Sequence, residues 1–143
     1  MDITHARSGL EIIPRKECLL LLAGRKVGRL AFNIADQPLV LPVNYVLVGD
    51  VVVFRTAEGA KLDALPSARV AFEVDDVDEA TGSGWSVVVQ GVAEEIADDD
   101  AWFTDVTSHP EVPQPWLPVR ADHHVRIRPR LISGRRLRPT SPD

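Results

Sequence analysis

The sequence predicts a mainly β protein, a six-stranded Greek-key barrel with a few short helices. Apolar residues gather in short β-rich runs, turn residues separate these runs, and helical patterns are confined to three short segments. Its 143 residues match the usual size of one domain, so we expect a single domain spanning residues 1–143.

The first element is a short helix. The segment Ile12–Ile13–Pro14 leads into Arg15–Ala23, where Pro14 suits a first helical turn and Gly24 suits the end. Two further segments, Ala57–Leu65 and Asp98–Val106, also have a helical pattern. Six segments are strand-like: Val27–Phe32, Leu39–Val48, Val51–Phe54, Arg69–Asp75, Trp85–Ile96 and His123–Ile132.

Turn and breaker residues refine these strands. Pro42 cannot donate to a β-ladder, so it marks an edge, a bulge or a corner. Gly49–Asp50 predicts the turn of a hairpin between the second and third strands. Asp76–Gly84 is expected to form a polar loop.

Charge and composition narrow the classes of function. The net charge of −5 argues against nonspecific nucleic-acid binding. Arginines cluster late, between Arg126 and Arg138, as a solvated strand face or an anion-binding rim, and the solvated face is favoured. We find no secretory signal and no membrane-length apolar run, so the cytoplasm is the expected compartment. Cys18 sits in an apolar run and is expected to be a buried, inert thiol.

The segment Val53–Leu62 is a candidate phosphate site. A strand ends at Arg55–Thr56, a turn passes through Gly59, and a helix follows near Lys61. Arg55 offers a planar fork of donors, Thr56 a hydroxyl and Lys61 a mobile charge. A strand–turn–helix with incidental surface charges explains the same pattern.

Two other segments are candidates for binding a flat ring. In Leu41–Tyr45, Asn44 offers polar groups to a ring edge and Tyr45 offers a ring for packing, but these residues alone favour an ordinary strand beside a corner. Trp85 opens a strand after a polar loop, where it either caps a ligand or anchors the loop on the barrel.

The sequence gives little support for a metal site or for a known catalytic or nucleotide-binding motif. His123 and His124 are adjacent on a strand and therefore face opposite sides, which disfavours a shared metal, and no protein-ligated metal is expected. We find no Ser–His–Asp arrangement, Walker loop or Rossmann glycine fingerprint.

Taken in order, these pieces resemble the pyridoxamine 5′-phosphate oxidase-like superfamily of FMN-binding split barrels. The resemblance covers nearly the whole chain and is closest to the short actinobacterial-type members. Its segments are Val27–Ala31, Pro42–Tyr45, Phe54–Thr56 with Gly59 and Lys61, Val70–Asp75, Gly84–Val87, Val125–Ile127 and Ser133–Arg136.

The resemblance implies a six-stranded split β-barrel that forms a homodimer, with FMN at the joint between the two copies. Arg55, Thr56 and Lys61 would hold the FMN phosphate, and the backbone of Val43 and Asn44 would face the ring. Trp85 and Ser86 would approach from the second copy. The implied cofactor-binding residues are Pro42, Val43, Asn44, Tyr45, Phe54, Arg55, Thr56, Lys61, Trp85 and Ser86.

The resemblance also implies an FMN-dependent oxidoreductase that passes a hydride between the flavin and a small-molecule substrate. The flavin carries that chemistry, so no catalytic side chain is required or identified. The chain lacks the C-terminal arginine and histidine tail of true pyridoxamine-phosphate oxidases, so a different substrate is expected. A flavin carrier or sensor without turnover is an alternative, as is binding of the deazaflavin F420 or of haem through His123 or His5.

Overall fold

The computed structural model describes residues 10–56, 68–97, 100, 102 and 123–138. One helix and eight strands fall within these ranges. They are β1 (Leu10–Ile13), α1 (Arg15–Ala23), β2 (Val27–Ile34), β3 (Gln37–Asn44), β4 (Val46–Val48), β5 (Val51–Thr56), β6 (Ala68–Asp78), β7 (Ser83–Glu95) and β8 (His123–Leu137). The predicted mainly β architecture is therefore confirmed.

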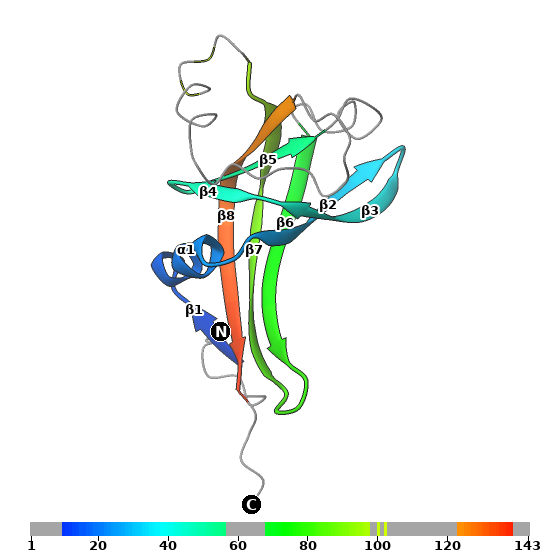
Figure 1. Ribbon diagram of the computed structural model, residues 1–143. Helices are drawn as coiled ribbons and strands as arrows, with labels where there is room; N and C mark the ends of the chain where they lie inside the picture. Colours follow the sequence, from blue (N-terminus) through cyan, green and yellow to red (C-terminus); the bar gives the residue numbers. More distant parts are fainter. Residues whose placement is uncertain (1–9, 57–67, 98–99, 101, 103–122, 139–143) are drawn as a thin grey trace, which may run out of the picture.

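All eight strands belong to one antiparallel sheet, which curls on itself (Figure 1). The order is β3-β2-β6-β7-β8-β5-β4, and β1 pairs with β8 outside this path. The long strands β6, β7 and β8 form the centre of the sheet, while β2–β3 and β4–β5 extend from its two sides. Segments distant in sequence therefore become neighbours, as β5 does with β8.

The hydrophobic core lies on the inner face of this curled sheet. Alternating residues of the long strands point inward, among them Phe72 of β6, Val87 and Val89 of β7 and Ile127 of β8. All four are fully buried. Because one face of each strand supplies the core, the alternate residues form an outer face that remains available for binding.

The predicted helix Arg15–Ala23 is confirmed, and Gly24 ends it by donating its backbone N–H to the carbonyls of the last turn. Pro14 lies at the N-cap, one residue before the predicted first turn. The structure corrects the preceding segment, because Ile12–Ile13 belong to β1 and pair with Arg135–Gly134 of β8. Such a short strand gives almost no periodic signal, and only its distant partner defines it.

The strand count is also corrected, from the six expected to eight. Apart from β1, the extra strand arises because Leu39–Val48 divides at Tyr45 into β3 and β4. The Tyr45 backbone N–H donates to the Lys26 carbonyl at 3.0 Å, which extends the β2–β3 register by one residue before β4 begins. Pro42 lies on β3 at the end of the strand order, as the edge prediction required, and Gly49–Asp50 form the predicted hairpin turn.

Asp76–Gly84 was expected to be a polar loop, and this expectation is wrong for most of the segment. β6 continues to Asp78 and β7 begins at Ser83, with cross-strand pairs Asp76↔Trp85 and Asp78↔Ser83. Only Glu79–Gly82 form the turn, where Gly82 has a φ of +70°. The polar residues of this segment favour a loop, but their pairing with β7 holds them in a strand.

Candidate functional site

The end of β5 lies beside the start of β8. Their register pairs Arg55 with His124 and Thr56 with His123. Arg55 is half-buried, whereas Thr56 is only 5% exposed. Adjacent strand residues face opposite sides, so at this end of the barrel Arg55 and His124 lie on one face and Thr56 and His123 lie on the other. All four carry groups that bind anionic oxygens when they act as donors.

The two histidines were not predicted to join Arg55, because β6 and β7 separate them from it in the sequence. His123 Nδ1 contacts the Glu95 carboxylate, and the Ile96 backbone N–H donates to the His124 carbonyl at 2.9 Å. These contacts fix the start of β8 against the end of β7. No local signal in the sequence marks this contact, since it depends only on strand order.

The other predicted parts of the phosphate site, Gly59 and Lys61, lie outside the described residues, as does the helix expected at Ala57–Leu65. Most of the helix expected at Asp98–Val106 also lies outside them. Of that segment, the Asp100 carboxylate accepts the Trp102 backbone N–H at 2.9 Å. The contact has the geometry of a side-chain cap, and the helix that it would begin stays a prediction.

The segment Pro42–Tyr45 passes from the edge strand β3 into the core. Pro42 is exposed, Asn44 is half-buried, and Val43 is buried. The Tyr45 ring is 2% exposed and meets the Phe72 ring edge-on, with 4.9 Å between the ring centroids. Its hydroxyl donates to the Leu22 carbonyl. In this structure the Tyr45 ring therefore fills the barrel interior and packs on Phe72.

Phe54 is likewise fully buried in the core. Its neighbours Arg55 and Thr56 therefore take their places from a strand that is anchored by an inward-facing aromatic ring.

Burial of Tyr45 raises the pKa of its hydroxyl well above its ordinary value, so this group is a neutral donor at physiological pH.

Trp85 and Ser86 lie on opposite faces of β7. Trp85 is half-buried and packs against the barrel core, with the Arg25 guanidinium 5.8 Å from its ring centroid. Of the two roles considered, this packing favours the anchoring one. Ser86 alternates with the buried Val87 and therefore faces outward, next to Arg135 in the register with β8.

Most of the late arginines lie beside carboxylates. Arg126 donates from Nε to Glu94 at 2.7 Å and contacts Asp100 at 3.1 Å, and its side chain is only 11% exposed. Arg128 donates to the same Glu94 carboxylate. Hydrogen bonds from Arg128 and then Arg126 hold the pKa of Glu94 below its ordinary value. This part of the cluster is a neutralised ion-pair network and does not leave an open anion site.

A second ion-pair group lies on the outer face of β2 and β6. Arg29 contacts Glu73 at 3.1 Å and Asp75 at 3.0 Å. Burial, followed by the hydrogen bond and charge of Asp75, raises the pKa of Glu73 to about 7. The pKa of Glu73 is thus raised and the pKa of Glu94 lowered relative to an ordinary glutamate.

Cys18 is fully buried, as expected, and its thiol lies against the Ile13 carbonyl. Burial raises the pKa of the Cys18 thiol. A protonated, enclosed thiol is a poor nucleophile, so Cys18 is part of the core.

Comparison with known proteins places this architecture in a family. The sequence profile described as pyridoxamine 5′-phosphate oxidase matches residues 14–136, which include every described strand except β1 and the last residue of β8. The chain belongs to the pyridoxamine 5′-phosphate oxidase family. The resemblance read from the ordered motifs is thereby confirmed.

Members of this family are similar to the chain over most of its length. The uncharacterized protein Rv0080 of Mycobacterium tuberculosis is 36% identical over 138 residues, which cover 92% of this chain and 88% of that protein. The FAD binding protein of Mycobacterium smegmatis is 35% identical, with a TM-score of 0.73 over 89% of this chain and 97% of its own. An FAD-binding protein of Mesorhizobium loti is 26% identical, with a TM-score of 0.70 over 89% and 96%.

The shared architecture confirms the split β-barrel prediction for this family member. Within the described residues, no helix has the length and apolar composition that a membrane crossing requires. The same ranges contain no group of three or more potential metal-binding side chains.

Proposed function

We propose that this chain binds FMN and, as a homodimer, acts as an oxidoreductase that transfers a hydride between the flavin and a small-molecule substrate. The observation that carries the proposal is the position of Arg55 and Thr56 at the end of β5, beside the two histidines of β8. Family membership and the two FAD-binding relatives support a flavin as the ligand.

The chemistry of these residues fits a terminal phosphate. A phosphate accepts several hydrogen bonds at one point and carries negative charge, and a guanidinium presents two parallel donors to it. Arg55 offers such a fork, and Phe54 fixes the strand beneath it by filling the core. In the proposal, Lys61 adds a second cation and the backbone of Val43 and Asn44 faces the flavin ring.

A bound flavin would supply the hydride chemistry. The protein's part is then to bind, orient and shield the flavin. Arg55 would hold the phosphate end, and the edge strand β3, which has a strand neighbour on one side only among the described residues, would offer backbone groups along the ring edge. Neither task demands a side chain that exchanges a proton.

The proposed homodimer would complete the site with residues from the second copy. Ser86 faces outward from β7, so it is placed to meet a partner, whereas Trp85 is held against its own barrel. Light scattering should give twice the 15.7 kDa chain mass, and Ser86→Arg should lower it towards one chain. A wild-type protein of one chain mass at the concentrations of flavin binding would exclude a composite site.

The binding test uses purified, flavin-free protein titrated with FMN by calorimetry. Arg55→Gln is expected to weaken FMN binding about thirtyfold, because loss of a charge-assisted contact costs about 2 kcal/mol. Lys61→Gln should have a similar effect. Arg15→Gln is the matched control, since Arg15 is 57% exposed and pairs only with Asp50 at the surface. Equal affinity in all four proteins would contradict the phosphate site.

FAD is a second candidate cofactor because two solved relatives are described as FAD-binding proteins. Titrating the same protein with FAD separates the two ligands. Binding of FMN at least as tight as that of FAD supports the proposal, whereas markedly tighter FAD binding replaces FMN by FAD.

Turnover distinguishes an oxidoreductase from a flavin carrier or sensor. The flavin-loaded protein is reduced with NADPH or NADH under anaerobic conditions, and its absorbance is followed while quinone and nitroaromatic acceptors are added. Reoxidation faster than that of free reduced flavin supports an oxidoreductase. Tight flavin binding without reduction or reoxidation across the panel would favour a carrier.

A further inference from the structure

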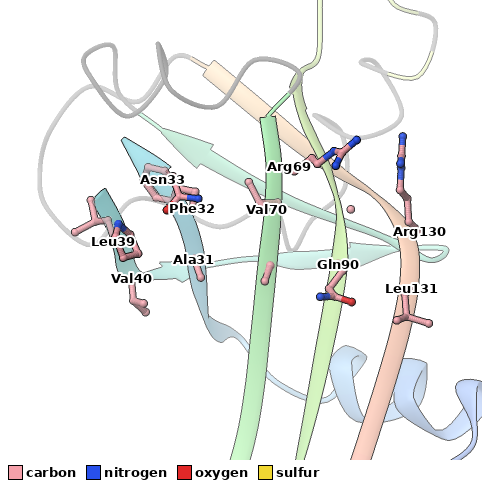
Figure 2. Close-up of a pocket in the computed structure, with 13 residues that line it drawn as sticks. Ala31, Phe32, Asn33, Leu39, Val40, Arg69, Val70, Gln90, Arg130 and Leu131 are labelled. Carbon is pink, nitrogen blue, oxygen red and sulfur yellow. The ribbon is translucent and has the colours of Figure 1, made fainter. Parts of the chain in front are cut away.

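An open groove of about 540 Å³ crosses the outer face of β3, β2, β6, β7 and β8 (Figure 2), and neither Arg55 nor Thr56 lines it. The β-ladder aligns Val40, Ala31, Ala71, Gln90 and Leu131 in one row across these five strands. We call this feature the outer groove. Its volume lies in the range of sites that hold small molecules.

The groove exists because its central residues are small. Ala31 and Ala71 place only methyl groups on the outer face, while Val40 and Leu131 rise at the two sides. Val40 is 58% exposed and Leu131 is 55% exposed. The sheet therefore presents a flat apolar floor between two apolar walls, a shape that suits a flat molecule.

Two arginines give the groove its charge. Arg69 of β6 and Arg130 of β8 extend at the same end of the groove, on either side of β7, and Gln90 lies near them (Figure 2). Within the described ranges, none of the residues that line the groove is acidic. Both arginines are exposed, and in the described part of the chain neither forms an ion pair, whereas seven other arginines contact carboxylates.

A β-bulge places Arg130 and Leu131 together beside the groove. Gln90 pairs with Leu131 and Gly91 pairs with Pro129, so Arg130 is an extra residue of β8 without a partner in the register. In a regular strand Arg130 would share the outer face with Arg126 and Arg128, and Leu131 would face the core. The bulge instead allows both residues to line the outer groove, and bulges often redirect a side chain in this way beside functional sites.

Gly91 makes this bulge feasible. A Cβ atom at position 91 would lie 2.1 Å from the Arg128 carbonyl oxygen and 3.2 Å from the Pro129 Cα. Only glycine admits that approach, and Pro129 needs no backbone donor in the irregular ladder. Together, the bulge at Arg130, Gly91 of β7 and Pro129 of β8 bring Arg130 and Leu131 onto the same outer face.

We propose that the outer groove binds a small, flat organic anion, with its carboxylate or phosphate between Arg69 and Arg130 and its apolar body over Ala31 and Ala71. The guanidinium groups match the charge and geometry of anionic oxygens, and Gln90 adds a neutral donor. This anion site is separate from the proposed flavin-phosphate site and does not depend on it.

The test uses benzoate as the probe and benzamide as its neutral counterpart, with flavin-free, full-length protein at low ionic strength. NMR spectra follow the Nε–H signals of Arg69, Arg130 and Arg135 and the side-chain amide of Gln90. Benzoate is expected to shift the first two arginine signals and the Gln90 signal saturably. Benzamide should bind at least about fivefold more weakly, since it lacks the charge.

Three variants sharpen the test. Arg69→Gln and Arg130→Gln should each weaken benzoate binding about fivefold, the effect of losing one partly exposed charge-assisted contact. Arg135→Gln is the matched control: Arg135 is also an exposed arginine of β8 without an ion pair among the described residues, but it lies outside the outer groove. Its benzoate affinity should stay within about twofold of the wild type.

Other outcomes overturn the proposal. Benzoate shifts that are equal at Arg135 would indicate nonspecific charge attraction, and equal affinity for benzamide would exclude a role for the anionic group. An absence of saturable shifts would exclude the site. If both groove variants instead lowered the light-scattering mass to one chain and benzoate did not bind, the arginines would serve contact between copies.

Discussion

The outer-face side of β8 contains two arginine-bearing stretches with opposite surroundings. In the first stretch, Arg126 and Arg128 share the Glu94 carboxylate, and Arg126 also contacts Asp100 and lies over the Trp102 ring at 5.3 Å. In the second stretch, Arg130 lies next to the apolar Leu131, in a groove whose described lining holds no acidic residue. One strand therefore holds arginines whose charge is neutralised by neighbouring carboxylates and an arginine whose charge is not neutralised by any carboxylate of the described residues.

The difference shows that arginine spacing alone does not assign a role. A regular alternation would place Arg126, Arg128 and Arg130 on one face, and the sequence analysis favoured a single solvated face. The bulge opposite Gly91 interrupts the alternation, so the two stretches meet different neighbours. The neighbours then decide which arginines remain able to bind an external anion.

The largest effect is expected from removing the bulge. Gly91→Ala should lower the free energy of unfolding by about 2–3 kcal/mol, because its methyl group would overlap the Arg128 carbonyl. Gly24→Ala is the control, since its Cβ would meet the nearest atom at an ordinary 3.6 Å. Urea denaturation measures both. A Gly91→Ala protein as stable as the control would mean that the strand relieves the overlap without cost.

The next effect separates the two stretches directly. Arg126→Gln should destabilise the protein by about 1–2 kcal/mol, since it removes one of the two guanidinium partners of Glu94 and the ion pair with Asp100. Arg130→Gln should change stability by less than about 0.5 kcal/mol, because it breaks no ion pair in the described structure. Matched urea curves compare the two, and equal losses would contradict the distinction drawn here.

Glu94 gives the first stretch a pH signature. Its folded pKa lies below the unfolded value of 4.5, so ionised Glu94 stabilises the protein above that pH and loses this contribution as the pH falls through the folded value. Glu94→Gln should cost about 1 kcal/mol at neutral pH and progressively less below pH 4.5. Denaturation curves across this range test it, and a cost that does not vary with pH would exclude the ionised pair as its cause.

Glu73, on the outer face near the groove, should show the opposite sign and the smallest effect. Its folded pKa of about 7 exceeds the ordinary value of 4.5, so wild-type stability should fall as the pH rises between these values. Glu73→Gln should remove this slope and stabilise the protein by less than about 1 kcal/mol at pH 8. A variant that loses stability as the pH rises would show that the Arg29 ion pair dominates.

The sequence by itself determined the local elements and the family. Helix Arg15–Ala23, the hairpin turn at Gly49–Asp50 and the edge position of Pro42 follow from short-range chemistry, namely glycine at a helix end, a tight turn and the missing proline donor. The ordered motifs also identified the pyridoxamine 5′-phosphate oxidase family.

Only the tertiary structure decided which residues meet. It placed His123 beside Thr56 and His124 beside Arg55. It also buried the Tyr45 ring in the core and paired Arg126 with Glu94. It also created the outer groove from two alanines on different strands and a bulge across a third. The physical reason is that strand order and register are fixed by the burial of the whole inner face, and no short stretch of sequence contains that information.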